Sequence, residues 1–223
     1  LVCTAIGLKP FLLENIFLQG SLFSDNELAT IGGLIAESYT GEIKKIGVQL
    51  LISGKAKTVG GVIGIAENTF MENLFSKTNI HMTNSTQETV GGLIGTLKSS
   101  GLFKSSLVNS LYWGTLEGNQ NVGGLVGSLK SNNSVIQNSF SISSIQVKKD
   151  SSGGPIIGNK ETFWIDFTET FYLAESHCSN CTSYFGNPLS EEFLKSKKTY
   201  SDWDFTYVWR IDEANSFPYI ENH

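Results

Sequence analysis

The chain has 223 residues, of which 23 are glycine, and its formal net charge is −5. Only 17% of its residues are charged, against roughly 25% in a typical soluble domain, a composition that disfavours a helical bundle. The net negative charge gives no basic surface of the kind that binds nucleic acid, so we expect no nucleic-acid partner. No apolar stretch approaches the ~20 residues that are needed to span a bilayer. The chain starts at Leu1 without a methionine, and we interpret it as a mature or excised fragment.

Five glycine pairs recur along the chain at intervals of about 30 residues. Their first members are Gly32, Gly60, Gly91, Gly123 and Gly153. Near-constant spacing of this kind predicts a stack of similar units, each burying its apolar face against the next. Within the pattern V-G-G-[LV]-[IV]-G, the glycines let the chain turn a corner close to the backbone of the neighbouring unit.

A second element lies between the glycine pairs and reads apolar-x-Asn-x-apolar. Its asparagines are Asn15, Asn73, Asn109 and Asn138; Val48 takes this place in the second unit and Glu169 in an altered last copy. The alternation predicts short strands with one face in a core, and the asparagines could form a ladder of amide hydrogen bonds. We therefore expect an all-β fold, a β-solenoid of about five ~30-residue rungs over residues 1–158.

The glycine pattern at this spacing, preceded by Ile136–Ser141 with the form I-x-N-S-F-S, resembles the GLUG repeat of bacterial surface proteins. That family includes adhesins and the non-catalytic parts of surface IgA-cleaving peptidases. The resemblance covers roughly residues 11–158, with the fifth glycine pair weakened by Ser152 and Pro155. It implies an exported, cell-surface or fibre-tip module and no catalytic residue.

Residues 159–223 differ in composition from the repeats, because aromatic residues crowd together and glycine is rare. We expect this segment to form a cap that covers the open end of the stack, with Trp203, Phe205, Trp209 and Pro218–Ile220 as its packing residues. Ser190 is expected to cap a short helix over residues 191–197, with two acidic residues near its positive end.

Some aromatic residues are harder to place in a core. One of Tyr112 and Trp113 should point outward, since adjacent strand residues face opposite ways, and three more aromatics lie in polar stretches. The candidate contact surface for a sugar ring or a partner protein consists of Tyr112, Trp113, Trp164, Tyr172 and Tyr184. We expect the ligand-binding surface to lie at such exposed aromatic residues and at the loops of uneven length, rather than on the uniform repeat.

The sequence gives little support for a metal or redox site at its cysteines, or for a catalytic site. Cys178 and Cys181 form a C-x-x-C pair, for which a local disulfide or two free thiols are the main interpretations. No nucleotide-binding or nucleophile motif is present, so we expect no cofactor, metal or catalytic residue. Asp166 and Glu169 are the one acidic pair that could serve a β-helix lyase or hydrolase.

Together these features predict a non-enzymatic adhesion or fibre-tip module, secreted or on a bacterial cell surface. Its partner would be a glycan or a surface protein of another cell. The alternatives are a carbohydrate-active β-helix enzyme and a purely structural stalk, which could assemble as a homotrimer. Fold alone does not choose among them.

Overall fold

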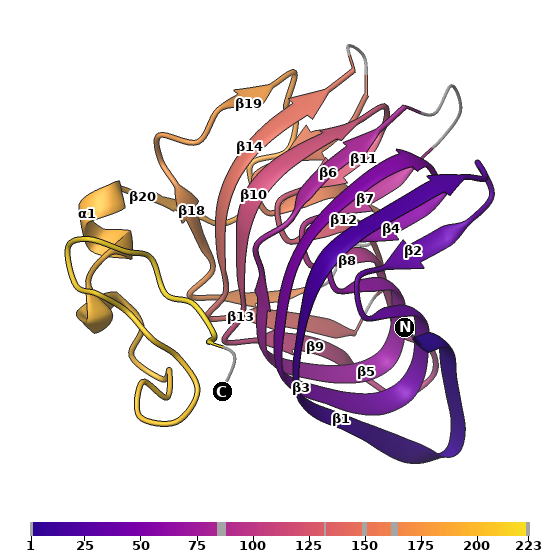
Figure 1. Ribbon diagram of the computed structural model, residues 1–223, viewed down its shortest axis with the longest axis horizontal. Helices are drawn as coiled ribbons and strands as arrows, with labels where there is room; N and C mark the ends of the chain where they lie inside the picture. Colours follow the sequence, from indigo (N-terminus) through magenta and orange to yellow (C-terminus); the bar gives the residue numbers. More distant parts are fainter. Residues whose placement is uncertain (1, 84–87, 132, 149–150, 162–164, 222–223) are drawn as a thin grey trace.

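The computed structural model describes residues 2–83, 88–131, 133–148, 151–161 and 165–221. The chain is a β-solenoid of about five turns built from parallel sheets, with a short helix near the C-terminus (Figure 1). The predicted fold class is therefore confirmed. Helices long and apolar enough to cross a membrane are not found among these residues.

The strands fall into a small corner sheet and a large sheet that wraps around the rest of each coil. The corner strands are β2 (Thr30–Gly32), β4 (Thr58–Gly60), β7 (Thr89–Gly91), β11 (Asn121–Gly123) and β15 (Gly153–Gly154). The first coils of the large sheet contain β1 (Val2–Asp25), β3 (Ile35–Lys55), β5 (Ile63–Ser76) and β6 (Asn79–Met82). The next coils contain β8 (Ile94–Lys98), β9 (Ser105–Val108), β10 (Leu111–Gly118), β12 (Val126–Lys130), β13 (Ser134–Gln137) and β14 (Phe140–Val147). The last coil contains β16 (Ile157–Lys160), β17 (Asp166–Thr168), β18 (Phe171–Leu173), β19 (Cys178–Ser179) and β20 (Asn187–Leu189).

The glycine pairs form the corners, as predicted, because the backbones of neighbouring coils meet there. A Cβ on Gly92 would lie 2.1 Å from the carbonyl oxygen of Gly124 in the next coil. Val59, Val90 and Val122 point inward beside these glycines and are completely buried. The fifth corner is shifted by one residue from our alignment, since Gly123 pairs with Gly154 and not with Gly153.

The asparagine positions are sharp left-handed bends and not straight strand positions as expected. Asn109, Asn138 and Glu169 lie between strands, whereas Asn15, Lys45 and Asn73 bend the long strands β1, β3 and β5. Asn15, Lys45, Asn73, Asn109, Asn138 and Glu169 all have φ between 45° and 58°. Asparagine adopts this left-handed conformation more readily than most residues, which explains the repeat. Val48 does not occupy this bend: Lys44 pairs with Glu72 and Ile46 with Leu74, so Lys45 is the equivalent residue.

The expected asparagine ladder is present only in part. Asn138 Nδ2 donates to Asn109 Oδ1 at 2.9 Å, but Asn73 Oδ1 accepts from the indole Nε1 of Trp209. The C-terminal segment thus takes up hydrogen-bonding capacity that a continuous ladder would have used.

The stacking continues past Gly158, because β17, β18 and β19 pair with β13 and β14 of the coil before. Residues 165–189, here called the end cover, close this end of the core. The Phe185 ring stacks on Phe167 with centroids 5.8 Å apart, and both pack against the main core.

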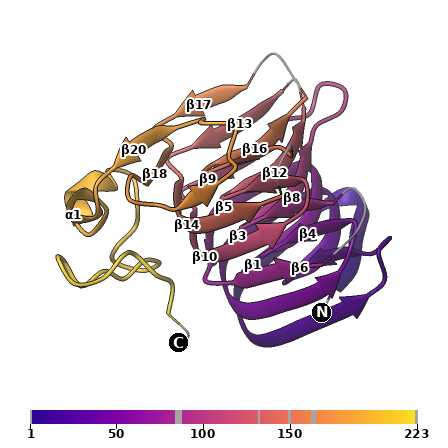
Figure 2. The ribbon, with the colours of Figure 1, turned by 90° about the horizontal axis from the view of Figure 1, so that it is seen from above.

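Residues 190–221, here called the lateral clamp, do not cover the end of the stack as expected. They run down one side of it towards the level of β1 (Figure 2). The reason is a column of outward-facing apolar residues in successive coils, including Phe75, Leu111 and Phe140, which needs cover from water. Trp203 and Trp209 supply it, with ring centroids 4.0 Å apart and 6% and 0% exposure.

The helix within the clamp is shorter than predicted. Helix α1 spans Glu191–Leu194 and is followed by the 3-10 turn η1 (Lys197–Thr199). Ser190 occupies the N-cap position with extended backbone angles, but its side chain makes no capping hydrogen bond. Leu194 is the buried residue of α1 and joins the clamp core.

Candidate functional site

The predicted aromatic contact surface is not assembled by the fold. Tyr112 is completely buried, and its hydroxyl donates to the carbonyl oxygen of Thr78 at 2.9 Å. It points inward because its strand register places it between Ser76 and Ser141, against Gly92. Tyr112 is therefore a core residue, which corrects its assignment to an exposed surface.

The three other candidates that the structure describes do not form one surface. Trp113 faces outward but packs edge-on against Phe217 of the clamp, with centroids 5.5 Å apart. Tyr172 is half-buried against the core, and Tyr184 is 63% exposed. Trp164 lies outside the described residues.

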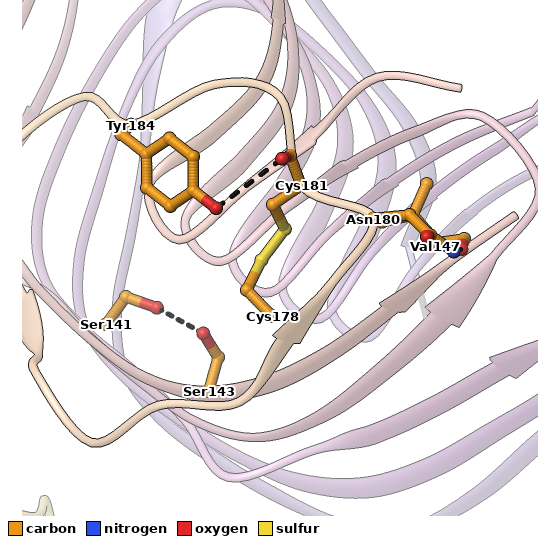
Figure 3. Close-up of a disulfide and its surroundings, with 7 residues drawn as sticks. All are labelled: Ser141, Ser143, Val147, Cys178, Asn180, Cys181 and Tyr184. Atoms are coloured by element: carbon orange, nitrogen blue, oxygen red, sulfur yellow. Dashed lines mark hydrogen bonds between the residues drawn. A yellow bond between two sulfur atoms is a disulfide. The ribbon is translucent and has the colours of Figure 1, made fainter. Parts of the chain in front are cut away.

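The C-x-x-C pair is a disulfide between Cys178 and Cys181 (Figure 3). It lies in the end cover, where both cysteines pack against the main core. Between them, Asn180 Nδ2 donates to the carbonyl oxygen of Val147 at 2.8 Å, and the Tyr184 hydroxyl contacts the carbonyl oxygen of Cys181. The Asn180 bond and the pairing of β19 with β14 fasten the last coil to the one before it, while the disulfide and the Tyr184 contact hold the turn of the last coil itself. The pair has a structural role here.

The acidic pair considered for catalysis lies on the exposed surface of the last coil. Asp166 is in β17, and Glu169 occupies the left-handed bend that follows it. Both side chains are exposed, and neither lines any of the pockets described below. His81 contacts Glu117 through Nδ1 at 2.5 Å, and both of these side chains are also well exposed.

A groove lined by residues of successive coils follows the corners of the solenoid. The corner strands lie on the side of the stack away from the lateral clamp (Figure 1). The volume of the groove is about 630 Å³, and its lining residues come from every coil between β2 and β16. We call it the corner groove. Smaller pockets of about 230 and 270 Å³ lie beside the clamp residues Tyr207 and Val208 and beside Trp113.

One wall of the corner groove is a column of small polar side chains. Thr30, Thr58, Thr89 and Asn121 are register partners in consecutive corner strands. Their side chains make no hydrogen bond with other described residues. Stacked strands lie ~4.8 Å apart, so this wall repeats one polar group at that interval.

The opposite wall is formed by the strands that follow the corners. Glu37, Ile65, Thr96, Ser128 and Asn159 are successive register partners, and all but Ser128 line the groove. Within the groove lining, Ile65 and Leu28 are the apolar side chains. The surface is thus mainly hydroxyl and amide.

The floor depends on the third glycine of the repeat. A Cβ on Gly64 would lie 2.6 Å from Thr30 Cγ2, and one on Gly95 would lie 2.7 Å from Thr58 Cγ2. Gly127 makes the equivalent approach to Thr89. Because a Cβ here would collide with the threonine methyl group, these glycines let the threonine wall approach the strands that follow the corners.

The charges of the groove are balanced. Lys57, Lys98 and Lys130 line it together with Glu37, Glu88 and Glu161. Lys130 Nζ pairs with Glu161 Oε1 at 3.0 Å. The lining therefore carries no strong field of either sign.

Glu88 is the unusual group in this lining. It is 1% exposed, its Oε1 accepts from the backbone N–H of Asn119, and its Oε2 has no partner among the described residues. Burial raises the pKa of the Glu88 carboxyl to about 7, and the nearby Glu117 adds to the rise, while the Asn119 N–H and His81 oppose it. The carboxyl therefore keeps its proton to a higher pH than an ordinary glutamate does.

The sequence contained a signal for this groove that we did not use. The residue two before each corner glycine is Thr30, Thr58, Thr89 or Asn121, a column of polar residues as regular as the glycines themselves. Glu88 gave no comparable signal, because its burial depends on how Gly118 and Asn119 of the next coil pack over it.

Comparisons of the chain with protein-family models, curated proteins and solved structures found no match. The case for a function therefore rests on the fold and on the geometry of the corner groove.

Proposed function

We propose that this chain is a non-enzymatic adhesion or fibre-tip module, secreted or held on a bacterial cell surface, that binds a glycan or a protein on another surface. The observation that carries the proposal is the corner groove, which no described segment covers and whose polar groups are arrayed along a rigid stack. The likeness of the repeat to GLUG-containing surface proteins supports the same function.

Rigidity favours recognition by this surface. The groove walls are strands locked into parallel ladders on both sides, for example β4 between β2 and β7. A binding surface that is ordered before the ligand arrives loses little conformational entropy on association. An array of fixed polar groups can therefore bind a ligand without rearranging.

The proposal is tested by screening the intact chain against glycan arrays and against extracts of cell-surface proteins. We expect a ligand whose binding is abolished by Asn121→Trp, which fills the groove, and is unchanged by Tyr207→Trp on the exposed surface of the clamp. If no glycan and no surface protein binds the wild-type chain, the proposed function is wrong.

A β-solenoid carbohydrate-active enzyme is the second candidate, and the raised pKa of Glu88 within the groove favours it. A glycosidase acid needs a second carboxylate at a defined separation. Turnover on a polysaccharide panel that is lost in Glu88→Gln, or in variants of Asp166 or Glu169, would select the enzyme over the adhesin. A stable trimer in sedimentation, with no ligand found, would select a structural stalk.

A further inference from the structure

We propose that the corner groove binds an uncharged linear polysaccharide that lies parallel to the stacking direction, with successive sugar units on successive coils. This inference rests on the proposed adhesion function and names the ligand class of its site.

The first argument is the periodicity of the wall. Thr30, Thr58 and Thr89 present the same hydroxyl once per coil, at the ~4.8 Å spacing of stacked strands. A ligand bonds to each coil in the same way only if it also repeats its polar groups at a similar interval. A linear chain of pyranose units does so, and the wall from Thr30 to Ser152 would hold about four of them.

The second argument is the chemistry of the wall. A threonine hydroxyl and an asparagine amide each donate and accept hydrogen bonds, as sugar hydroxyls do. The hydroxyls of Thr30, Thr58 and Thr89 have no partner among the described residues.

One buried oxygen without a partner lies in the same groove lining. Glu88 Oε2 makes no hydrogen bond with the described residues. Such an atom is costly to leave unpaired, and a water that bridges it to a hydroxyl-rich ligand would pair it.

The third argument excludes charged polymers. Three lysines and three glutamates line the groove, and one of each is already paired. A polyanion would gain from Lys57 and Lys98 but would approach Glu37, and also Glu88 wherever that carboxyl is ionised. A polycation would meet the opposite problem, so an uncharged chain fits best.

The fourth argument excludes an extended peptide. Peptides commonly add to a free sheet edge, but the backbone groups of β4, β7 and β11 are already paired with the coils on both sides. The lining also offers few apolar side chains that could hold those of a peptide.

The test is titration calorimetry of the whole chain with neutral glucan, xylan and mannan oligosaccharides of increasing length. Polygalacturonate and sulfated oligosaccharides serve as charged comparators. We expect affinity to rise with length up to about four units and then level off. Thr58→Val with Thr89→Val, which keeps the shape and removes two hydroxyls, should weaken binding about tenfold.

The matched control is Thr168→Val with Thr206→Val, which removes two exposed hydroxyls outside the groove that, like those of the wall, make no hydrogen bond with the described residues. Equal weakening by both double variants, or none by the groove variant, would overturn the groove assignment and leave the adhesion function standing. Preference for the charged comparators, or for a peptide that competes in the groove, would overturn the ligand class. Failure of every oligosaccharide to bind the wild-type chain would also overturn the ligand class. The adhesion function itself would be wrong only if the glycan-array and surface-protein screen found no ligand either.

Discussion

The two long sides of this solenoid expose different chemistry although the same coils form both. On the clamp side, successive coils present Phe75, Leu111 and Phe140, and a tail rich in tryptophan covers them. On the groove side, successive coils present threonine and asparagine, and no described segment covers them. A repeat can therefore assign stability to one side and leave the other available for recognition.

The covered side should dominate stability. Trp209→Ala removes a completely buried ring that contacts Phe75 and donates a hydrogen bond to Asn73. We expect the free energy of unfolding to fall by about 3–5 kcal/mol, as for other buried tryptophans. Urea denaturation measures this, and a loss below about 1 kcal/mol would show that the clamp is not part of the cooperative fold.

Glu88 gives the groove side one large effect, which depends on pH. Its pKa is about 7 in the folded chain against 4.5 for an ordinary glutamate, so the folded state holds its proton more tightly. The contribution of this carboxyl to the stability of the fold is therefore fully present below pH 4.5, and it is lost as pH rises through 7.

Glu88→Gln should remove this dependence. Relative to the variant, the wild type should lose roughly 2–3 kcal/mol of stability between pH 5 and pH 8. Parallel urea titrations at the two pH values test this, with Glu161→Gln as an exposed control. Identical pH profiles for wild type and Glu88→Gln would mean that the carboxyl is hydrated.

The groove floor should be sensitive to even one methyl group. In Gly95→Ala the new Cβ would lie 2.6 Å from the carbonyl oxygen of Gly64, so the backbone must shift, at roughly 1–3 kcal/mol. Ala36 occupies the same register position as Gly64 in β3, and Ala36→Gly should change stability by less than about 1 kcal/mol. Thermal melts of the Gly95→Ala and Ala36→Gly variants test this prediction. Equal changes in stability for the two variants would contradict the inference that close backbone approach requires glycine at position 95.

The smallest expected effect on stability comes from the groove wall. Thr58→Val and Thr89→Val keep branched side chains on strands and remove hydroxyls that make no internal hydrogen bond. Each should change the free energy of unfolding by less than about 0.5 kcal/mol. A large loss in denaturation would place these hydroxyls in the scaffold and remove the contrast between the two sides.

The sequence predicts the repeating part of the molecule better than the part that does not repeat. The solenoid and its glycine corners could be predicted directly, because repetition makes local preference and stacking agree. The repeated asparagines were also recognised, but they were expected inside short strands, whereas Asn73, Asn109 and Asn138 form left-handed bends. Lys45 escaped recognition, since a single lysine in a left-handed bend has no sequence signature.

The non-repeating parts were harder to predict for a physical reason. Whether Trp209 covers an end or a side depends on contacts with Asn73, 136 residues away in sequence. The inward direction of Tyr112 likewise depends on its register with Ser76 and Ser141. Long-range register of this kind is not encoded in local alternation.

The central claim is that the groove side, not the clamp side, meets the ligand. Its most direct test is methyl NMR of the chain labelled at threonine, titrated with a neutral oligosaccharide found by the calorimetric screen. We predict that the Thr30, Thr58 and Thr89 methyl resonances shift together, while those of Thr199 and Thr206 in the clamp stay unchanged. Shifts confined to the clamp, with the three groove methyls unmoved, would contradict the account.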